Sequence, residues 1–225
     1  MKQIVAIDGP SGSGKSTVAA LLSKELGYMH LDTGAMYRAV ALAAANENIP
    51  FDDPVGLDRL CERIRIELRQ REDKVAVYLN GRDVSDAIRS PEMSLGSSAV
   101  SSIAQVRSHM VRLQREVGAR GGIVAEGRDM GTVVFPDTQA KFYLDASPAE
   151  RARRRWLQLK ELGIDEDPDK VRQEMEERDR KDSSREHSPL KKADDAIHID
   201  TTGMDIDQVV KTLARKVEEL EGSGA

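Results

Sequence analysis

The sequence has few residues of the kinds that build disulfides, zinc sites or aromatic stacking surfaces. Its 225 residues include one cysteine, four histidines, three Phe, four Tyr and one Trp. The single cysteine, Cys61, excludes an internal disulfide and a cysteine-rich zinc site, and it suits a reducing compartment. The histidines are not spaced as metal ligands are, and we assign no chemistry to them.

Long hydrophobic runs are also missing. The longest apolar run covers residues 39–45, far short of the roughly 20 residues that span a membrane. The apolar residues 4–7 meet Asp8 at once, so no signal peptide is expected here. We therefore expect a cytoplasmic protein that does not bind membranes.

Positive charge is not in excess, since 34 Lys and Arg stand against 39 Asp and Glu and the net charge is −5. This balance creates no long-range field that would attract nucleic acid, and the scarce aromatic residues provide no platform for stacking bases. We therefore expect no nucleic-acid partner. Arginine makes up 22 of the 34 basic residues, and its planar guanidinium suits bidentate contacts with phosphate.

The most informative stretch is residues 9–16, GPSGSGKS, which matches the pattern G-x-x-x-x-G-K-[ST] between an apolar run and an amphipathic one. Its glycines let the backbone curl so that N–H groups point inward, and the following helix adds its positive end. Lys15 is expected to reach the β- and γ-phosphates of a nucleotide, and the Ser16 hydroxyl to coordinate Mg²⁺. The predicted nucleotide-binding residues are Gly9, Pro10, Ser11, Gly12, Ser13, Gly14, Lys15, Ser16 and Thr17.

Five short apolar runs predict strands, and helical stretches separate them. This alternation is typical of an α/β fold with a parallel sheet. Because parallel strands end at one edge, where ligands bind, the side chains that follow them should converge there. Each acidic residue among them could equally serve as a helix N-cap. The predicted strands cover residues 4–7, 29–31, 122–125, 141–144 and 196–199, and the converging residues include Lys15, Asp32, Arg128 and Asp129.

Two regions do not fit this pattern. Residues 63–68 and 75–79 alternate with period two, and Asn80 and Gly81 then signal a hairpin, so residues 52–97 are expected to form a small antiparallel insert over the substrate. Residues 151–189 are highly charged and poor in apolar side chains, which favours a mobile helical lid. The remaining core covers residues 1–51, 98–150 and 190–221, with a flexible tail at 222–225.

The lid carries several arginines. Arg178, Asp182 and Arg185 are spaced to share one helix face, and Arg154 lies on the preceding helix. Arginines on a closing lid can stabilise a phosphoryl group in transfer, whereas the alternative is ion pairing on a solvated helix. We predict that Lys15, Arg154, Arg178 and Arg185 are the catalytic residues.

Two further segments carry candidate substrate contacts. Arg128 and Asp129 form an adjacent charged pair after a predicted strand, where a structural turn would need only glycines. Asp32, Thr33 and Arg38 place an acid, a hydroxyl and a guanidinium after the second strand.

Several motifs together resemble those of the bacterial cytidylate kinases, within the nucleoside monophosphate kinases. They are IDGPSGSGKST, LDTGAMYR, IRSPE, GRDMGTVVFPD, YLDAS and ERDRKDSSR, and they span nearly the whole sequence. The resemblance implies a P-loop kinase core, an inserted monophosphate-binding subdomain, and transfer of a phosphoryl group from ATP to CMP and dCMP. We expect a monomer that needs Mg²⁺, with Ser16 or Thr17 as the ligand, and motif position favours Ser16.

The resemblance further implies roles for individual residues. Thr33, where relatives commonly have Ser, would lie with Arg38, Arg128 and Arg185 near the acceptor phosphate. Cytosine would contact Ser98, Arg107 and Asp129, and the ribose would contact Arg178 and Asp182.

The chemistry of the base agrees with this reading. Cytosine presents an amine donor beside two acceptors, so a pocket specific for it needs one carboxylate and one hydrogen-bond donor. The acceptor phosphate is already ionised at neutral pH, so no general base is required.

Two other functions remain open from the residues alone. Asp32 could act as the base of a kinase for small alcohols, although this leaves the insert and the Arg128–Asp129 pair without a role. A nucleotide-dependent switch that binds nucleic acid is the second, and the net negative charge weighs against it.

Overall fold

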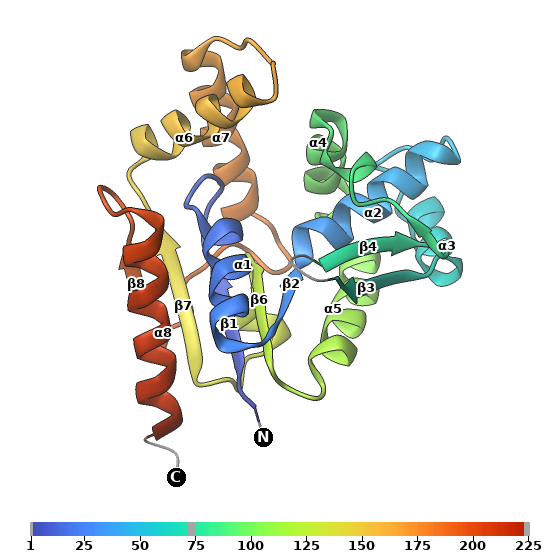
Figure 1. The fold of residues 1–225 in the computed structure, drawn as a ribbon. Coiled ribbons are helices and arrows are strands. Elements are labelled where there is room, and N and C mark those ends of the chain that lie inside the picture. The colour runs from blue at the N-terminus through green and yellow to red at the C-terminus, as the bar shows by residue number, and fades with distance from the viewer. Residues whose placement is uncertain (1, 72–74, 223–225) are drawn as a thin grey trace.

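A five-stranded parallel sheet forms the centre of the computed structural model, which describes residues 2–71 and 75–222. The strand order is β2-β6-β1-β7-β8, and every neighbouring pair is parallel (Figure 1). The five predicted strands are thereby confirmed. Their bounds are β1 (Ile4–Asp8), β2 (Met29–Asp32), β6 (Ile123–Gly127), β7 (Ala140–Asp145) and β8 (Ile197–Asp200).

Helices cover both faces of this sheet. Alternate residues of a strand point to opposite faces, so one strand can contribute side chains to the hydrophobic cluster on each face. Val5 and Ile7 of β1 belong to one hydrophobic cluster with α1 (Lys15–Leu26) and α8 (Ile206–Gly222). Ala6, between them, belongs to the other cluster, with α2 (Thr33–Asn46) and α5 (Ala104–Gly118).

The insert is an antiparallel sheet with a helix on each side in sequence. Its elements are α3 (Pro54–Arg63), β3 (Ile66–Gln70), β4 (Val75–Leu79), β5 (Arg82–Asp83), a 3₁₀ turn η1 (Ala87–Arg89) and α4 (Pro91–Val100). The predicted hairpin is present, with Asn80 and Gly81 at φ 49° and 79° between β4 and β5. The strand predicted from residue 63 begins instead at Ile66, because α3, capped by Asp53, runs to Arg63.

The insert is not a separate hydrophobic unit. Leu57, Ile88 and Met93 of the insert share one cluster with Leu31 and Met36 of the core. The expected boundary at residue 97 lies inside α4, which packs along α2. The insert is therefore anchored on the core through α2.

The lid has a small hydrophobic cluster of its own. Its helices, α6 (Pro148–Glu161) and α7 (Pro168–Ser183), enclose Ala152, Leu159, Val171 and Met175. Trp156 packs against this cluster, and its indole N–H donates to the Glu166 carbonyl at 3.0 Å. Figure 1 shows the two lid helices above the ends of the strands.

One turn departs from regular structure, since η2 (Met130–Val134) is a turn of π-helix after β6. Within the described residues, no helix has the length and apolar composition needed to cross a bilayer. The predicted tail at 222–225 falls outside the described residues after Gly222.

Candidate active site

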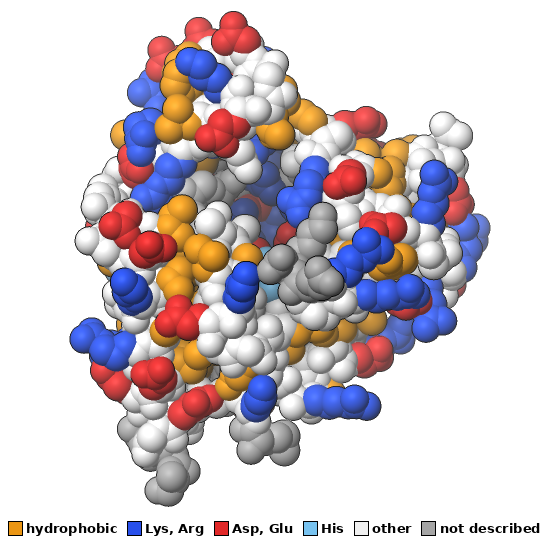
Figure 2. All heavy atoms as spheres, in the orientation of Figure 1, with side chains coloured by type: hydrophobic (Ala, Val, Ile, Leu, Met, Phe, Trp, Pro, Cys, Tyr) orange, Lys and Arg blue, Asp and Glu red, His pale blue; other side chains and the backbone are white. Residues whose placement is uncertain are grey.

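A cleft of about 810 Å³ opens between the lid and the insert, above the carboxyl ends of the strands. Figure 2 shows this hollow with Lys and Arg side chains in its depth. Its lining includes Ser94, Ser98, Arg155, Met175, Arg178 and Arg185. Ligands of parallel α/β sheets bind at this edge.

The loop between β1 and α1 has the shape of a phosphate cradle. Gly9 has φ 155°, and a Cβ there would lie 2.0 Å from the Leu144 carbonyl oxygen. Gly12 has φ 75°, which side chains rarely adopt. Lys15 Nζ donates to the Pro10 carbonyl at 2.9 Å, inside the loop. Burial, together with the nearby Arg128 guanidinium, lowers the pKa of Lys15 to about 7, so an anionic ligand would stabilise its charged form.

Ser16, in the phosphate loop, contacts Glu126, a residue that the sequence analysis did not single out. Ser16 Oγ donates to Glu126 Oε2 at 2.6 Å, and His30 Nε2 lies 3.1 Å from Glu126 Oε1. Glu126 is buried at the end of β6, next to β1. The sequence signal that could have identified Glu126 is its position directly after the predicted strand at residues 122–125.

Asp129 and Arg107 form a buried ion pair between the turn that follows β6 and helix α5. The Arg107 guanidinium donates to the Asp129 carboxylate and, at 3.2 Å, to the Ser101 carbonyl. It also lies 5.7 Å from the centre of the Tyr37 ring. The structure thus brings together the two residues that were expected to contact cytosine.

Asp182 holds two further predicted residues. Its carboxylate accepts from Arg128 Nε at 2.8 Å and from the Arg185 guanidinium. Arg178 lies near Arg128 and Asp182. Its buried Nε has no hydrogen-bond partner among the described residues. Burial and the charge of Arg128 lower the pKa of Arg178 to about 10. A phosphate group would therefore relieve repulsion among these arginines.

Asp32, the last residue of β2, and Thr33, which follows it, already make hydrogen bonds within the protein. Asp32 N-caps α2 by accepting from the Ala35 N–H at 2.8 Å, and it also accepts from Arg38 Nη2 at 2.9 Å. Thr33 Oγ1 donates to the Glu126 carbonyl at 2.6 Å. The capping role that the sequence left open for Asp32 is thus present.

Arg154 lies apart from the Asp182 cluster. Its guanidinium donates to the Thr201 carbonyl at 2.8 Å and to Glu150 at 2.9 Å. A Cβ on Gly14 would lie 3.7 Å from its Nη1, so Arg154 borders the phosphate loop.

A second lid contact reaches the phosphate loop and was not predicted. Arg151 Nη1 donates to the Ser11 carbonyl at 3.1 Å and pairs with Asp179, which accepts from the Ser11 N–H at 3.3 Å. The start of α6 and the middle of α7 are thereby docked on the loop.

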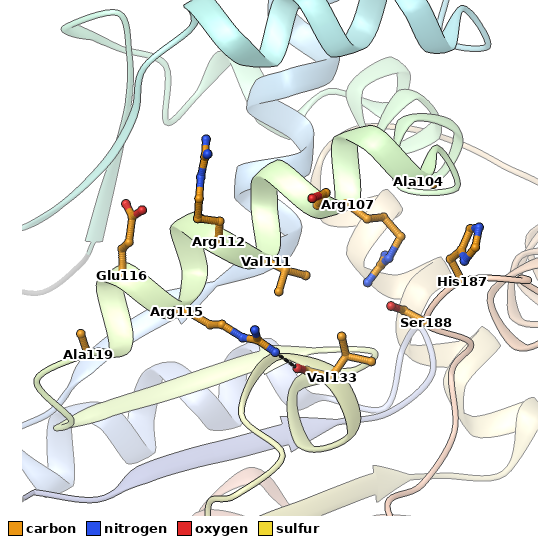
Figure 3. A pocket seen from close by; sticks show the side chains of 11 residues that line it. Ala104, Arg107, Val111, Arg112, Arg115, Glu116, Ala119, Val133, His187 and Ser188 are labelled. Atoms are coloured by element: carbon orange, nitrogen blue, oxygen red, sulfur yellow. Dashed lines mark hydrogen bonds between the residues drawn. The ribbon is translucent and has the colours of Figure 1, made fainter.

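A separate groove of about 710 Å³ runs along the outer side of α5 (Figure 3). Arg107 lines it as well. Arg115 crosses it and donates to the Val133 carbonyl at 2.6 Å and to the Val134 carbonyl at 3.0 Å. These bonds tie α5 to the turn that follows Asp129.

The sequence is similar to known proteins over almost its whole length. The family model described as cytidylate kinase matches residues 5–219. A cytidylate kinase of Syntrophotalea carbinolica is 51% identical over 218 residues, covering 97% of this chain and 93% of the relative. A cytidylate kinase of Geobacter sulfurreducens is 49% identical over 218 residues, covering 97% and 94%.

A solved structure, that of an uncharacterized protein from Eubacterium ventriosum, has a TM-score of 0.54 and 11% identity, covering 97% of this chain and 99% of its own. At that identity the likeness concerns the fold alone. The family model and the close relatives, by contrast, cover the loop, the insert and the lid together. The chain therefore belongs to the cytidylate kinase family.

Proposed function

We propose that this protein transfers the γ-phosphoryl group of ATP to CMP, giving ADP and CDP, and that it also accepts dCMP. The observation that carries the proposal is the buried ion pair of Asp129 and Arg107. Asp129 can accept from the cytosine amine, and Arg107 can donate to the neighbouring ring acceptors. Uracil presents the opposite polarity at the amine position and would leave a buried group unpaired.

The phosphate loop is the donor half of the site. Its N–H groups and Lys15 would bind the β- and γ-phosphates. Arg38, Arg128 and Arg185 would hold the acceptor phosphate, with Thr33 at its edge, while Ser98 lies near the base. Arg178 and Arg154 would reach the transferred group from the lid, and Asp182 would contact the ribose while keeping its two arginines in place.

Catalysis by these groups is alignment and charge neutralisation. The acceptor oxygen is already ionised at neutral pH, so no side chain has to remove a proton. Asp32, which a kinase for alcohols would use as its base, instead caps α2 and pairs with Arg38. This favours a phosphate acceptor over an alcohol.

The residues at the loop mouth also fit Mg²⁺. Ser16 Oγ and the Glu126 carboxylate are adjacent oxygen donors, which this hard cation prefers. The described residues contain no group of three His, Cys, Asp or Glu that could hold a metal, as suits an ion held mostly by phosphate oxygens and water. Ser16 would hold it, with Glu126 orienting the hydroxyl. Bound there with ATP, Mg²⁺ would neutralise charge on the phosphates.

A coupled assay with Mg·ATP against CMP, dCMP, UMP, AMP and small alcohols tests the proposal. We expect CMP to be the best acceptor, with dCMP close to it. Asp129→Asn should lower kcat/KM for CMP by at least about tenfold, because a buried polar partner is lost. Asp137→Asn, which changes an exposed carboxylate beyond the same turn, is the matched control.

Three results would count against the proposal. Faster turnover of an alcohol would favour the rival kinase. Salt-dependent binding of RNA without any nucleoside diphosphate product would favour a switch. An unchanged preference for CMP over UMP in Asp129→Asn would move base recognition to other residues.

A further inference from the structure

Asp8, the last residue of β1, has a role that the binding of nucleotide does not explain. Its carboxylate is only 4% exposed and is bonded to the turn that follows β6. Oδ1 accepts from the Met130 N–H and Oδ2 from the Gly131 N–H, each at 2.8 Å. Burial raises the pKa of Asp8 to about 6, so at neutral pH the group is ionised and both oxygens accept.

These two N–H groups begin the π-helical turn, and the first N–H groups of a helical turn have no partner within it. The bonds within the turn start later, where the N–H groups of Val133 and Val134 reach the Asp129 carbonyl at 2.9 and 3.1 Å. The residue expected to cap the turn is Asp129, because it occupies the N-cap position and Asp is a favoured N-cap.

Asp129 does not cap its own turn. Its side chain makes no capping hydrogen bond and pairs with Arg107 instead. A carboxylate has two oxygens, so an Asp129 that capped the turn would have one fewer oxygen to share between Arg107 and a base. Asp8 therefore supplies, from the neighbouring strand, the bonds that Asp129 would otherwise make.

We propose that Asp8 is a specificity-positioning residue, which caps the turn at Met130 and Gly131 and so leaves the Asp129 carboxylate available to the cytosine amine. The inference rests on the proposed function of Asp129. It joins the two halves of the site, since one residue precedes the phosphate loop and fixes the turn that reads the acceptor base.

The far end of the same turn is held independently. Arg115 donates to the Val133 and Val134 carbonyls from α5, as Figure 3 shows for Val133. Loss of Asp8 therefore frees only the first residues of the turn, next to Asp129. The expected change is a local one, in which the Asp129 side chain swings back to cap Gly131.

The test compares Asp8→Asn and Asp8→Ala with the unaltered protein, using kcat/KM for CMP and for UMP. We expect kcat/KM for CMP to fall at least about tenfold while that for UMP changes little, which lowers the CMP preference toward that of Asp129→Asn. In the double variant Asp8→Ala/Asp129→Asn, the two losses of preference should not add, because both act through one carboxylate.

The matched control is Thr138→Val. Thr138 Oγ1 donates to the Ile4 carbonyl, so this change also removes a hydrogen bond to β1, but at the opposite end of the strand. It should lower stability without altering the CMP preference. A purely structural Asp8 would behave in the same way, and an unchanged CMP to UMP ratio in both Asp8 variants would overturn the proposal.

Hydrogen exchange measured by NMR provides a test that does not depend on activity. The amides of Met130 and Gly131 should exchange faster in Asp8→Ala, while those of Val133 and Val134 keep their protection. Unchanged protection at Met130 and Gly131 would also overturn the proposal. If the unaltered protein shows no preference for CMP, the proposed function fails, and the exchange measurement still decides whether Asp8 is the cap.

Discussion

Asp182 binds both Arg128 and Arg185, while the Nε of Arg178 has no hydrogen-bond partner among the described residues. Breaking such a pair leaves a buried charge uncompensated, whereas an unpaired guanidinium is available to a ligand. The residues of the cluster therefore differ in what they do. Asp182 fixes the position of Arg185, whereas the Nε of Arg178 is left for the substrate in the function we propose.

Arg178→Ala should lower kcat by about 100-fold, because a donor aimed at developing charge is lost, with little change in melting temperature. Steady-state kinetics and thermal unfolding measure the two effects. Arg180→Ala, an exposed arginine on the same helix, is the control and should leave both unchanged. A large loss of stability in Arg178→Ala would show that the residue is structural.

Lys15→Ala should reduce turnover by about 100-fold or more, since the group that contacts the transferred phosphoryl is removed. Within the part of the chain that the structure describes, Lys15 Nζ donates to the Pro10 carbonyl, which is a bond inside the loop, so the fold should persist. Lys24→Ala, an exposed change on the same helix, provides the comparison. Substantial remaining activity would contradict the assignment of the loop.

At the scale of elements, the strands and the phosphate loop were predictable because their signals are local. A short apolar run before an acidic turn predicts a strand, and glycines and a lysine at fixed spacing predict a phosphate loop. Each of these signals lies within a few consecutive residues. Helix starts at Asp53 and Asp167, each followed by proline, were equally local. The candidate site was therefore predictable as far as its residues lie next to such signals.

The π-helical turn was not predictable in this way. Thr132, Val133 and Val134 are β-branched and favour a strand, yet they form a helical turn. Its cap, Asp8, lies 122 residues away from Met130 in the sequence, and only the pairing of β1 with β6 brings the two together. The docking of Arg151 and Asp179 on Ser11 was missed for the same reason.

The lid should open locally before the protein unfolds, because its hydrophobic cluster is small and separate from the core. Val171→Ala is expected to speed amide exchange across residues 151–189 with little change in the global unfolding free energy. Leu213→Ala, in the core cluster, should instead lower that free energy by about 2–5 kcal/mol. Equal global losses in both variants would show that the lid unfolds together with the core.

For the whole molecule, the exposed large hydrophobic side chains of the described residues are spread over several elements. They are Leu21 on α1, Val55 on α3, Leu95 on α4, Leu157 on α6, Leu162 just after α6 and Ile206 on α8. Contiguous apolar patches mark stable interfaces, and single exposed residues do not. Sedimentation analysis should therefore show a monomer of 24.8 kDa at micromolar concentration, and a mass that doubles with concentration would contradict this.

The separate hydrophobic cluster of the lid also bears on how such an enzyme can adapt to the growth temperature of its host. The insert shares one large cluster with the core, so a substitution in that cluster affects the stability of both. The lid depends instead on Ala152, Leu159, Val171 and Met175, with Trp156 and Ile164 beside them. Selection for activity in the cold or in the heat could therefore act through these few positions, which set the stability of the lid and leave the packing of the sheet unaltered.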